Sequence, residues 1–376
     1  MLNRKAWCVG LAAAVLGSYG LFAQPSAADS GKFADVNLHP EKFGKAEELK
    51  DITPYCGDKE IKVALSDGFG SNSWRKITLA EAMDEASKCP NIVEFRYTDG
   101  QGSPQKQISD IQGLIAQQFD VIILYPDGGE AILKAMRQAT QAGIAVVPYM
   151  IGEQFPGARG EDYLLIATER VSSVGEAIAE WTVRELKGEG NVVVLGGTPG
   201  NPTTAGIAEG WKKVFAQHPG ITVLEGPVDT NWDPAEAQRV MAGLLAKYPK
   251  IDAVLHDYGL GSMGALRAFV AAGRPIPLWA GQDANELACA WYELKDANPN
   301  FKLAGVSART WLSRLALRKA VAAVQGIEND EPTIVALPLA EDSTDPNLQP
   351  KCDPSLPPDA ILSTQLSEQQ MKDLFK

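Results

Sequence analysis

One alternation of apolar runs and helical patterns occurs twice along this chain, and it constrains the fold more than any other feature. The runs at 61–67, 91–99, 119–127 and 144–150 are separated by segments with apolar residues at helical spacing. The same order of strand, loop and helix returns at 191–217, 221–249 and 250–281. Apolar strands separated by helices indicate a parallel sheet that is covered on both faces. The sequence therefore predicts an α/β fold of two similar, doubly wound parallel-sheet lobes.

The loops after the strands are the expected ligand-binding region, because open parallel sheets bind ligands beyond the carboxyl ends of their strands. In the first lobe these loops are 67–75, 99–103, 125–129 and 149–153, and in the second they are 197–204, 229–233, 256–261 and 281–285. Two facing rims of this kind form a cleft, and clefts between domains commonly hold small ligands. We therefore expect a small-molecule site between the lobes.

The stretch GLGSMG in the second lobe has the outline of a dinucleotide-binding fingerprint. Gly259, Gly261 and Gly264 give the spacing G-x-G-x-x-G, and Asp283 follows about twenty residues later. Such a fingerprint normally follows the first strand of its fold, whereas this one follows the third strand of a second lobe. We interpret the glycines as packing residues at a tight turn from strand to helix, with Gly264 letting the helix approach the sheet. We expect no NAD and no other cofactor.

Composition and missing motifs argue against several classes of function. A formal net charge of −12 disfavours nucleic acid and anionic membranes as partners. The chain has no G-x-S-x-G elbow and no phosphate-loop motif, and its histidines are scattered at His39, His218 and His256. Its cysteines and histidines also lack metal-ligand spacing. We therefore expect neither enzymatic activity nor a metal site.

The N-terminus has the composition of a secretory signal peptide. Arg4 and Lys5 precede an apolar stretch that ends in small residues, and Ser26 and Ala28 suit cleavage after Ala28. We expect export to the periplasm, and a retained membrane anchor is the alternative interpretation. Residues 29–58 are polar and lack a clear period, so we expect them to form an extended leader.

Four cysteines follow the predicted signal peptide, an even number that permits two disulfides in three possible pairings. Cys56 lies just before the first strand and Cys89 just after the first helix, so these two positions could meet. We therefore favour the pairs Cys56–Cys89 and Cys289–Cys352.

Three stretches of the chain resemble the type I periplasmic binding proteins of the ribose and galactose class, which are the ligand receptors of sugar ABC importers. The stretches are SNSWRKITLAEAMDEA at 71–86, FDVIILYPDGGEAILKAMRQATQAGIAVV at 119–147, and DAVLHDYGLGSMGALRAFVAAG at 252–273 followed by WAGQDAN. The resemblance covers roughly residues 59–340. It implies three hinge crossings, near Thr168, Arg309 and Pro338.

The resemblance also implies a domain organisation and a role. The N-terminal lobe would be 59–167 plus 310–338, and the C-terminal lobe and tail would be 168–309 plus 339–376. The implied role is a periplasmic monomer that closes on a sugar-like ligand and delivers it to a membrane permease. A periplasmic sensor that feeds a chemoreceptor or a histidine kinase is the alternative. A repressor with this fold would need a helix-turn-helix before the first strand, where this chain has a signal peptide and a leader.

By the same resemblance, six positions belong to the ligand site. Trp74 and Trp232 correspond to stacking aromatics of the two lobes, and Asp283 corresponds to a carboxylate that binds hydroxyls. Core packing is the alternative for Trp74, and capping of the following helix is the alternative for Asp283. The remaining positions are two polar contacts and a residue that is often Asn in the family: Asn72, Arg309 and Tyr258. Asp257 and His256, which lie beside Tyr258, are further candidates.

The chain also departs from the family pattern at its charged positions. The Asp-Arg pair expected after the fourth strand is replaced by YMIGE, which leaves Glu153 as the nearest acid, and the arginine expected in the second lobe is Ala205. Arg75 and Arg170 are candidate replacements, with surface ion pairing as the alternative for each. Because displaced arginines aim their donors differently, we expect a ligand other than plain ribose. A pentose, a hexose, a sugar alcohol and a sugar acid all remain open.

Overall fold

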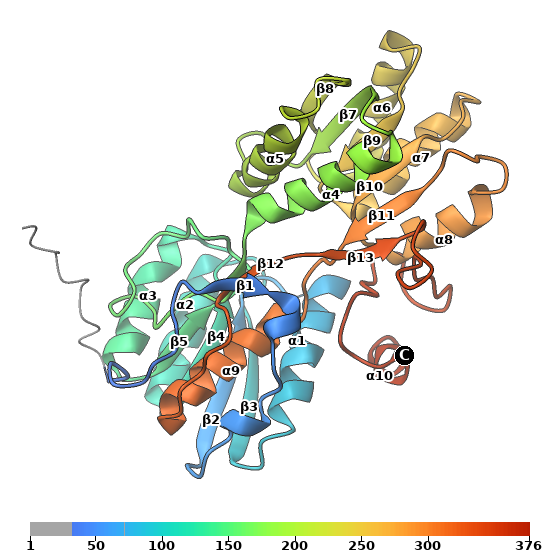
Figure 1. The fold of residues 1–376 in the computed structure, drawn as a ribbon. Helices are drawn as coiled ribbons and strands as arrows, with labels where there is room; N and C mark the ends of the chain where they lie inside the picture. The colour runs from blue at the N-terminus through green and yellow to red at the C-terminus, as the bar shows by residue number, and fades with distance from the viewer. Residues whose placement is uncertain (1–31, 71) are drawn as a thin grey trace, which may run out of the picture.

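The computed structural model describes residues 32–70 and 72–376, and it shows two α/β lobes joined by a hinge (Figure 1). Each lobe contains one sheet of mostly parallel strands with helices on both faces, which confirms the predicted fold class. The predicted signal peptide, residues 1–28, lies outside the described residues. Within the described ranges, no helix is both long enough and apolar enough to cross a bilayer.

The N-terminal lobe has a four-stranded parallel sheet in the order β3-β2-β4-β5. Its strands are β2 (Ile61–Asp67), β3 (Ile92–Asp99), β4 (Val121–Tyr125) and β5 (Ala145–Pro148). One face is covered by α1 (Ser73–Ala86) and α9 (Leu312–Gln325), and the other by α2 (Pro104–Ala116) and α3 (Glu130–Gln141). The run VIILY in β4 is apolar throughout because its side chains alternate between these two buried faces.

The C-terminal lobe has a six-stranded sheet in the order β13-β11-β10-β9-β7-β8. Its strands are β7 (Gly190–Gly196), β8 (Ile221–Asp229), β9 (Ala253–His256), β10 (Leu278–Gln282), β11 (Leu303–Val306) and the antiparallel edge strand β13 (Leu339–Asp342). Its helices are α4 (Val171–Glu185), α5 (Pro202–Phe215), α6 (Pro234–Lys247), α7 (Gly259–Ala271) and α8 (Asn285–Leu294). Helices α4 and α5 approach closely at Gly175, which has no Cβ. A Cβ there would lie 1.9 Å from the carbonyl oxygen of Ile207.

A third, three-stranded parallel sheet lies between the lobes. It consists of β1 (Phe43–Lys45), β12 (Ile334–Ala336) and β6 (Thr168–Glu169), in that order. Two of these strands are chain crossings, whereas β1 belongs to the segment predicted to be a leader. The same segment contains the 3-10 turns η1 (Ala46–Glu48) and η2 (Thr53–Tyr55). Residues 32–58 of the leader are therefore a docked part of the folded protein, while the exact lobe boundaries stay a prediction.

One buried lysine helps to hold the leader to the N-terminal lobe. Lys319 of α9 is fully buried, and its Nζ donates to the carbonyl oxygens of Leu38 (2.8 Å), Asn329 (3.0 Å) and Glu331 (2.6 Å). Burial lowers the pKa of Lys319 to about 7. Leu38 and Ile52 of the leader also join the apolar core of the lobe. This segment lacks a helical or strand period because its residues pack singly, which hides its order from a periodicity argument.

Both predicted disulfides are confirmed. Cys56 and Cys89 are bonded with their Cα atoms 5.2 Å apart, and the bond joins the leader to the segment after α1. Cys289 and Cys352 are bonded with their Cα atoms 4.9 Å apart, and this bond joins α8 to the C-terminal tail. The tail ends in the short helix α10 (Glu368–Leu374).

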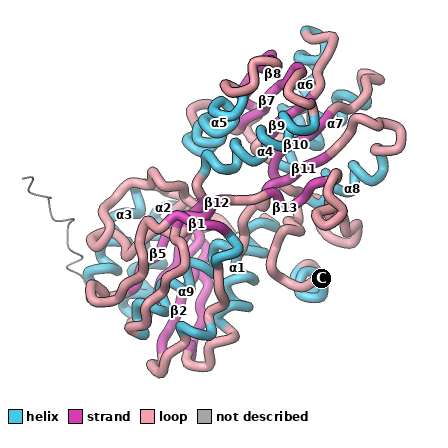
Figure 2. The backbone as a smooth tube through the Cα atoms, viewed as in Figure 1, coloured by secondary structure: helices cyan, strands magenta, loops and turns pink. Residues whose placement is uncertain are grey.

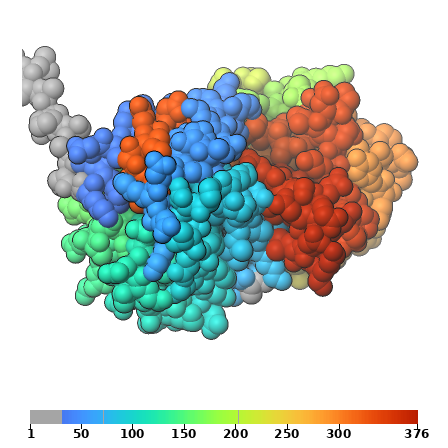
Figure 3. Space-filling view, turned by 90° about the horizontal axis from the view of Figure 1, so that it is seen from below, coloured from blue at the N-terminus to red at the C-terminus, as the bar shows by residue number. Residues whose placement is uncertain are grey.

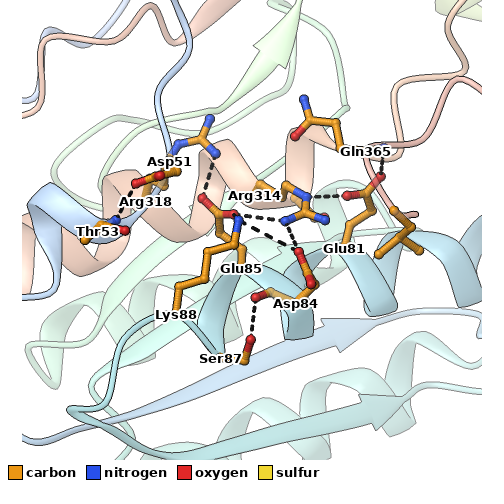
Figure 4. Close-up of polar contacts among 12 residues, drawn as sticks. Asp51, Thr53, Glu81, Asp84, Glu85, Ser87, Lys88, Arg314, Arg318 and Gln365 are labelled. Atoms are coloured by element: carbon orange, nitrogen blue, oxygen red, sulfur yellow. Dashed lines mark hydrogen bonds and ion pairs between the residues drawn. The ribbon is translucent and has the colours of Figure 1, made fainter. Parts of the chain in front are cut away.

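A buried ion-pair network joins α1 to α9 (Figure 4). The guanidinium of Arg314 binds Glu81, Asp84 (2.6 Å) and Glu85 (2.9 Å). Arg318 bridges Glu85 (3.0 Å) to Glu331 (2.9 Å), which lies after α9. Burial favours a higher pKa for Glu85, but the neighbouring cations outweigh burial and hold this pKa below its usual value.

Loss of one cation from this network should destabilise the N-terminal lobe strongly. Arg318→Met leaves Glu85 and Glu331 with a missing partner in the interior, so we expect a loss of about 3–5 kcal/mol in the free energy of unfolding. The matched control is Lys213→Met, which removes an exposed cation paired with Glu176 and should cost less than about 1 kcal/mol. Urea unfolding measures both, and equal midpoints for the two variants would contradict the prediction.

Candidate functional site

Arg75 is the centre of a polar cluster at the rim of the N-terminal lobe. It lies in the first turn of α1, where its Nη1 donates to Asp67 at the end of β2 (2.7 Å) and its Nη2 to Asp127 after β4 (2.7 Å). Its guanidinium carbon lies 3.9 Å from the ring centroid of Tyr125 and 4.8 Å from that of Trp74. Arg75 is only 7% exposed, so its ion pairs are internal to the rim and are not the surface pairs that the sequence left open.

Aromatic side chains surround this cluster. The ring of Tyr125 meets the ring of Trp74 edge-on at 5.6 Å and that of Tyr149 at 6.0 Å. The hydroxyl of Tyr97 donates to Asp67 (3.3 Å). The hydroxyl of Tyr149 is buried and has no hydrogen-bond partner among residues 32–70 and 72–376. The N-terminal rim therefore combines flat apolar faces with oxygen acceptors, which is the chemistry that binds a polyhydroxylated ring.

The carboxylates of this rim have raised pKa values. Burial raises the pKa of Asp67 to about 6, although Arg75 acts against the rise. Burial also raises the pKa of Asp127, which shares the same guanidinium. Two carboxylates thus share one cation, and the guanidinium of Arg75 has no charge left unpaired.

The rim of the C-terminal lobe is built around Asp257, directly after β9. Its carboxylate accepts hydrogen bonds from the indole of Trp232 (3.0 Å) and from the hydroxyl of Thr204 at the start of α5 (2.6 Å). The indole of Trp232 lies over Gly197, where a Cβ would come within 2.2 Å of the ring. Burial raises the pKa of Asp257, and the charge of Arg309 partly offsets the rise. Asp257 therefore fixes the orientation of the predicted stacking residue.

The predicted hinge cations are all paired. The Nε of Arg309 binds Glu169 of β6 at 2.8 Å, so two chain crossings meet in one ion pair. The Nε of Arg170 lies 3.5 Å from Glu153, and its guanidinium carbon lies 3.7 Å from the ring centroid of Phe43 in β1. Arg170 and Glu153 thus lie beside the leader.

Trp74 links the N-terminal rim to the hinge. Its indole Nε1 donates to the carbonyl oxygen of Ala308 (2.9 Å), and the half-buried ring packs against apolar residues of both neighbouring cores. Asn72 is exposed and caps α1 by accepting from the backbone of Arg75 (2.9 Å). Tyr258 is half-buried and precedes α7, and burial raises its pKa with contributions from Asp359 and Asp233. The ligand contacts of these residues stay predictions.

Asp283 has a different position from the one expected of a ligand-binding carboxylate. It is 3% exposed, and its two oxygens accept from the backbone N–H groups of Ala308 (2.7 Å) and Ser363 (3.1 Å). Burial raises the pKa of Asp283 and of the neighbouring Glu341. Asp283 does not cap α8 either, because the N-cap residue is Ala284. Its carboxylate joins the hinge to the C-terminal tail, and no sequence pattern predicts this contact of the tail.

The three glycines of the apparent fingerprint are required by close packing. A Cβ on Gly259 would lie 2.6 Å from the carbonyl oxygen of Gln282, at the end of β10. A Cβ on Gly264 would lie 1.6 Å from the carbonyl oxygen of Pro234, so this glycine lies against α6. The prediction that Gly264 lets the helix approach the sheet is wrong. Gly261 lies against the ring of His256, whose pKa burial lowers to about 3. His256 is therefore neutral and packed inside the C-terminal lobe.

Several residues of the two rims were not singled out from the sequence. Asp67, Tyr125, Asp127, Tyr149 and Thr204 all lie in the rim loops named above, so their position after a strand was the signal that could have found them. The sequence alone could not show which of them matter most. Asp67 and Asp127 meet at Arg75 only because β2 and β4 are neighbours in the sheet.

Residues 63–328 match the periplasmic binding protein domain family, and the chain belongs to this family. The ribose import binding protein of Escherichia coli (strain K12) is 28% identical over 236 residues, which cover 59% of this chain and 77% of that protein. The D-xylose-binding periplasmic protein of the same organism is 29% identical over 60% of this chain and 68% of its own length. The xylitol-binding protein of Mycolicibacterium smegmatis is 28% identical over 52% of this chain and 55% of its own.

Solved structures share the fold. The binding protein of the arabinose ABC transporter from Shewanella sp. ANA-3, bound to L-arabinofuranose, superposes with a TM-score of 0.61 at 20% identity, covering 74% of this chain and 91% of that one. A solute-binding protein from Bacillus halodurans C-125 with bound myo-inositol superposes with a TM-score of 0.59 at 21% identity, covering 75% and 94%. The type I periplasmic binding protein architecture expected from the sequence is thereby confirmed.

Removal of the Asp283 carboxylate should destabilise the protein. Asp283→Ala leaves two buried N–H groups without an acceptor, so we expect a loss of about 2–4 kcal/mol in the free energy of unfolding. Asp283→Asn should lose less, because the amide oxygen keeps one of the two hydrogen bonds. Asp233→Ala, which removes the N-cap of α6, is the control and should cost about 1 kcal/mol. If chemical denaturation finds Asp283→Ala as stable as the control, the carboxylate does not hold the tail.

Proposed function

We propose that this chain is the solute-binding component of an ABC importer, exported to the periplasm, and that it binds an uncharged sugar or polyol between its two lobes. The ligand enters between the rims and the lobes rotate about the hinge until both rims contact it. Closure is favoured because only the closed state provides both sets of contacts. The membrane permease then recognises the closed form. The family membership and the sugar-binding and polyol-binding relatives support this role.

One observation carries the choice of an uncharged ligand: each arginine among the predicted site residues already has a carboxylate partner. Arg75 binds two aspartates, Arg309 binds Glu169, and Arg170 lies near Glu153. The second rim adds the carboxylate of Asp257, which accepts hydrogen bonds from the neutral side chains of Thr204 and Trp232. An anionic ligand would have to break a buried ion pair to gain an arginine. The hydroxyls of a neutral ligand can instead donate to these carboxylates.

The proposed contacts are divided between the two rims. Trp74, Tyr125, Trp232 and Tyr258 supply ring faces for the C–H surfaces of the ligand. Asp127 and Asp257 supply acceptors, with Asn72 as a further polar group at the edge of the first rim. Arg75 holds the N-terminal acceptors in place, and Asp283 is left out because its oxygens are occupied.

A thermal-shift screen tests the ligand class. The screen covers pentoses, hexoses, polyols and uronic acids. We expect one of the neutral compounds to raise the melting temperature and the uronic acids to leave it unchanged. At a concentration of 100 Kd, binding adds about 2.7 kcal/mol of stability, which shifts the midpoint by several degrees. NAD is included as a control because of the glycine spacing. Stabilisation by uronic acids alone would overturn the charge argument, and stabilisation by NAD alone would overturn the proposed role.

Truncation of Trp232 should weaken binding of the compound found in the screen. Trp232→Ala removes the ring face, and we expect an affinity loss of about tenfold, or 1.4 kcal/mol. Trp232→Phe keeps an aromatic face but loses the donor to Asp257, so we expect a smaller loss. Isothermal titration calorimetry measures both affinities, and circular dichroism checks the fold. Native affinity for Trp232→Ala would remove this residue from the site.

A further inference from the structure

The C-terminal tail contacts both lobes. We call residues 350–376 the strap. It runs as an irregular loop and becomes helical only in α10, close to the C-terminus (Figure 2). In the space-filling view it lies between the blue residues of the N-terminal lobe and the orange residues of the C-terminal lobe (Figure 3). The strap therefore adds a noncovalent link between the lobes beside the hinge.

The first part of the strap is fixed to the C-terminal lobe. Cys352 is bonded to Cys289 of α8. Asn285, the first residue of α8, is buried, and its amide donates to the carbonyl oxygens of Asp353 (2.8 Å), Leu356 (3.3 Å) and Pro357 (3.2 Å). The oxygen of the same amide accepts from the backbone N–H of Asp353 (2.9 Å). One side chain thus holds a whole turn of the strap.

The last part of the strap is fixed to the N-terminal lobe. The carboxylate of Glu81 in α1 accepts from the hydroxyl of Thr364 and from the backbone N–H of Gln365 (2.7 Å). The side chain of Gln370 in α10 donates to Asp84 (2.6 Å). Met371 of α10 packs in an apolar cluster with residues of α1.

Only two residues of chain separate the anchor on the C-terminal lobe from the anchor on the N-terminal lobe. The backbone N–H of Ser363 is bound to Asp283 of the C-terminal lobe, and that of Gln365 is bound to Glu81 of the N-terminal lobe. Two residues of chain span at most about 7 Å, so these points cannot separate further while both bonds persist. The hydroxyl of Ser363 also bonds that of Ser307 (2.7 Å), one residue before Ala308, whose carbonyl binds Trp74. The short segment between the two anchors, residues 363–365, therefore lies at the hinge.

We propose that the strap pins one edge of the hinge, so that the lobes rotate about this point but cannot open widely. Asp359 adds a second restraint, because its carboxylate accepts from the hydroxyl of Ser73 at the start of α1 (2.7 Å). Limited opening raises the fraction of molecules whose rims are within reach of one ligand, and apparent affinity scales with that fraction. The inference goes beyond the proposed function and holds for any ligand.

Added slack is the direct test, because it leaves both anchors and their buried surfaces in place. The slack variant carries six Gly/Ser residues inserted between Ser363 and Thr364, together with Asp359→Ala. The control variant carries Asp359→Ala and the same insertion between Pro346 and Asn347, in an exposed loop before the first anchor. Both are compared with the native chain, without ligand, by small-angle X-ray scattering and by hydrogen exchange of residues 306–311.

We expect the slack variant alone to show a larger radius of gyration and at least about threefold faster exchange of the hinge amides. The control should match the native chain in both measurements, and urea unfolding should show equal stability for the two insertions. Identical scattering and exchange for both variants would overturn the strap. Because no ligand is present, this outcome is independent of the proposed function, which the thermal-shift screen tests separately.

Discussion

Glu81 is fully buried, and its carboxylate receives donors from three separate parts of the chain. Arg314 reaches it from α9, Thr310 from the segment before α9, and Thr364 and Gln365 from the tail. A buried carboxylate without these partners would carry a large desolvation penalty, so the helix pair, the hinge and the tail depend on one another. The position of α1, and with it the position of Arg75 at the rim, follows from this anchoring.

The rim of the N-terminal lobe follows from a second buried cation. Arg75 is a candidate replacement for a ligand-binding arginine that the family pattern has elsewhere, but it stacks on Tyr125 and forms ion pairs with Asp67 and Asp127. The guanidinium of Arg75 is therefore held inside the rim. The groups that the rim offers to a ligand are carboxylates and aromatic rings. The second rim repeats the logic with Asp257 holding Trp232. In each lobe an aspartate helps to hold an aromatic ring in place. In the first lobe it does so through Arg75, and in the second Asp257 binds the indole of Trp232 directly.

The sequence was sufficient for the fold because its information is periodic. Buried parallel strands read as apolar runs, and their repetition at 61–150 and 191–281 fixed the class and the rim loops. The Cys56–Cys89 disulfide also followed from the order of elements, and Cys289–Cys352 was the pair that remained. Two features were beyond this reasoning. The leader packs by single contacts such as Leu38 with Lys319, and the tail reaches Asp283 from 80 residues away in the chain. Neither leaves a period, and both depend on the completed tertiary structure.

The N-terminal lobe draws its core from widely separated parts of the chain. Leu38 and Ile52 come from the leader, the sheet from 61–148, and Leu315 from α9, while β1 of the leader pairs only with β12. Long-range pairing of this kind cannot form until residue 336 is available, so most of the chain must be synthesised before this lobe can complete its core. Late completion keeps the emerging polypeptide unfolded for longer. For the export proposed above, such a delay would leave the chain unfolded while it crosses the membrane.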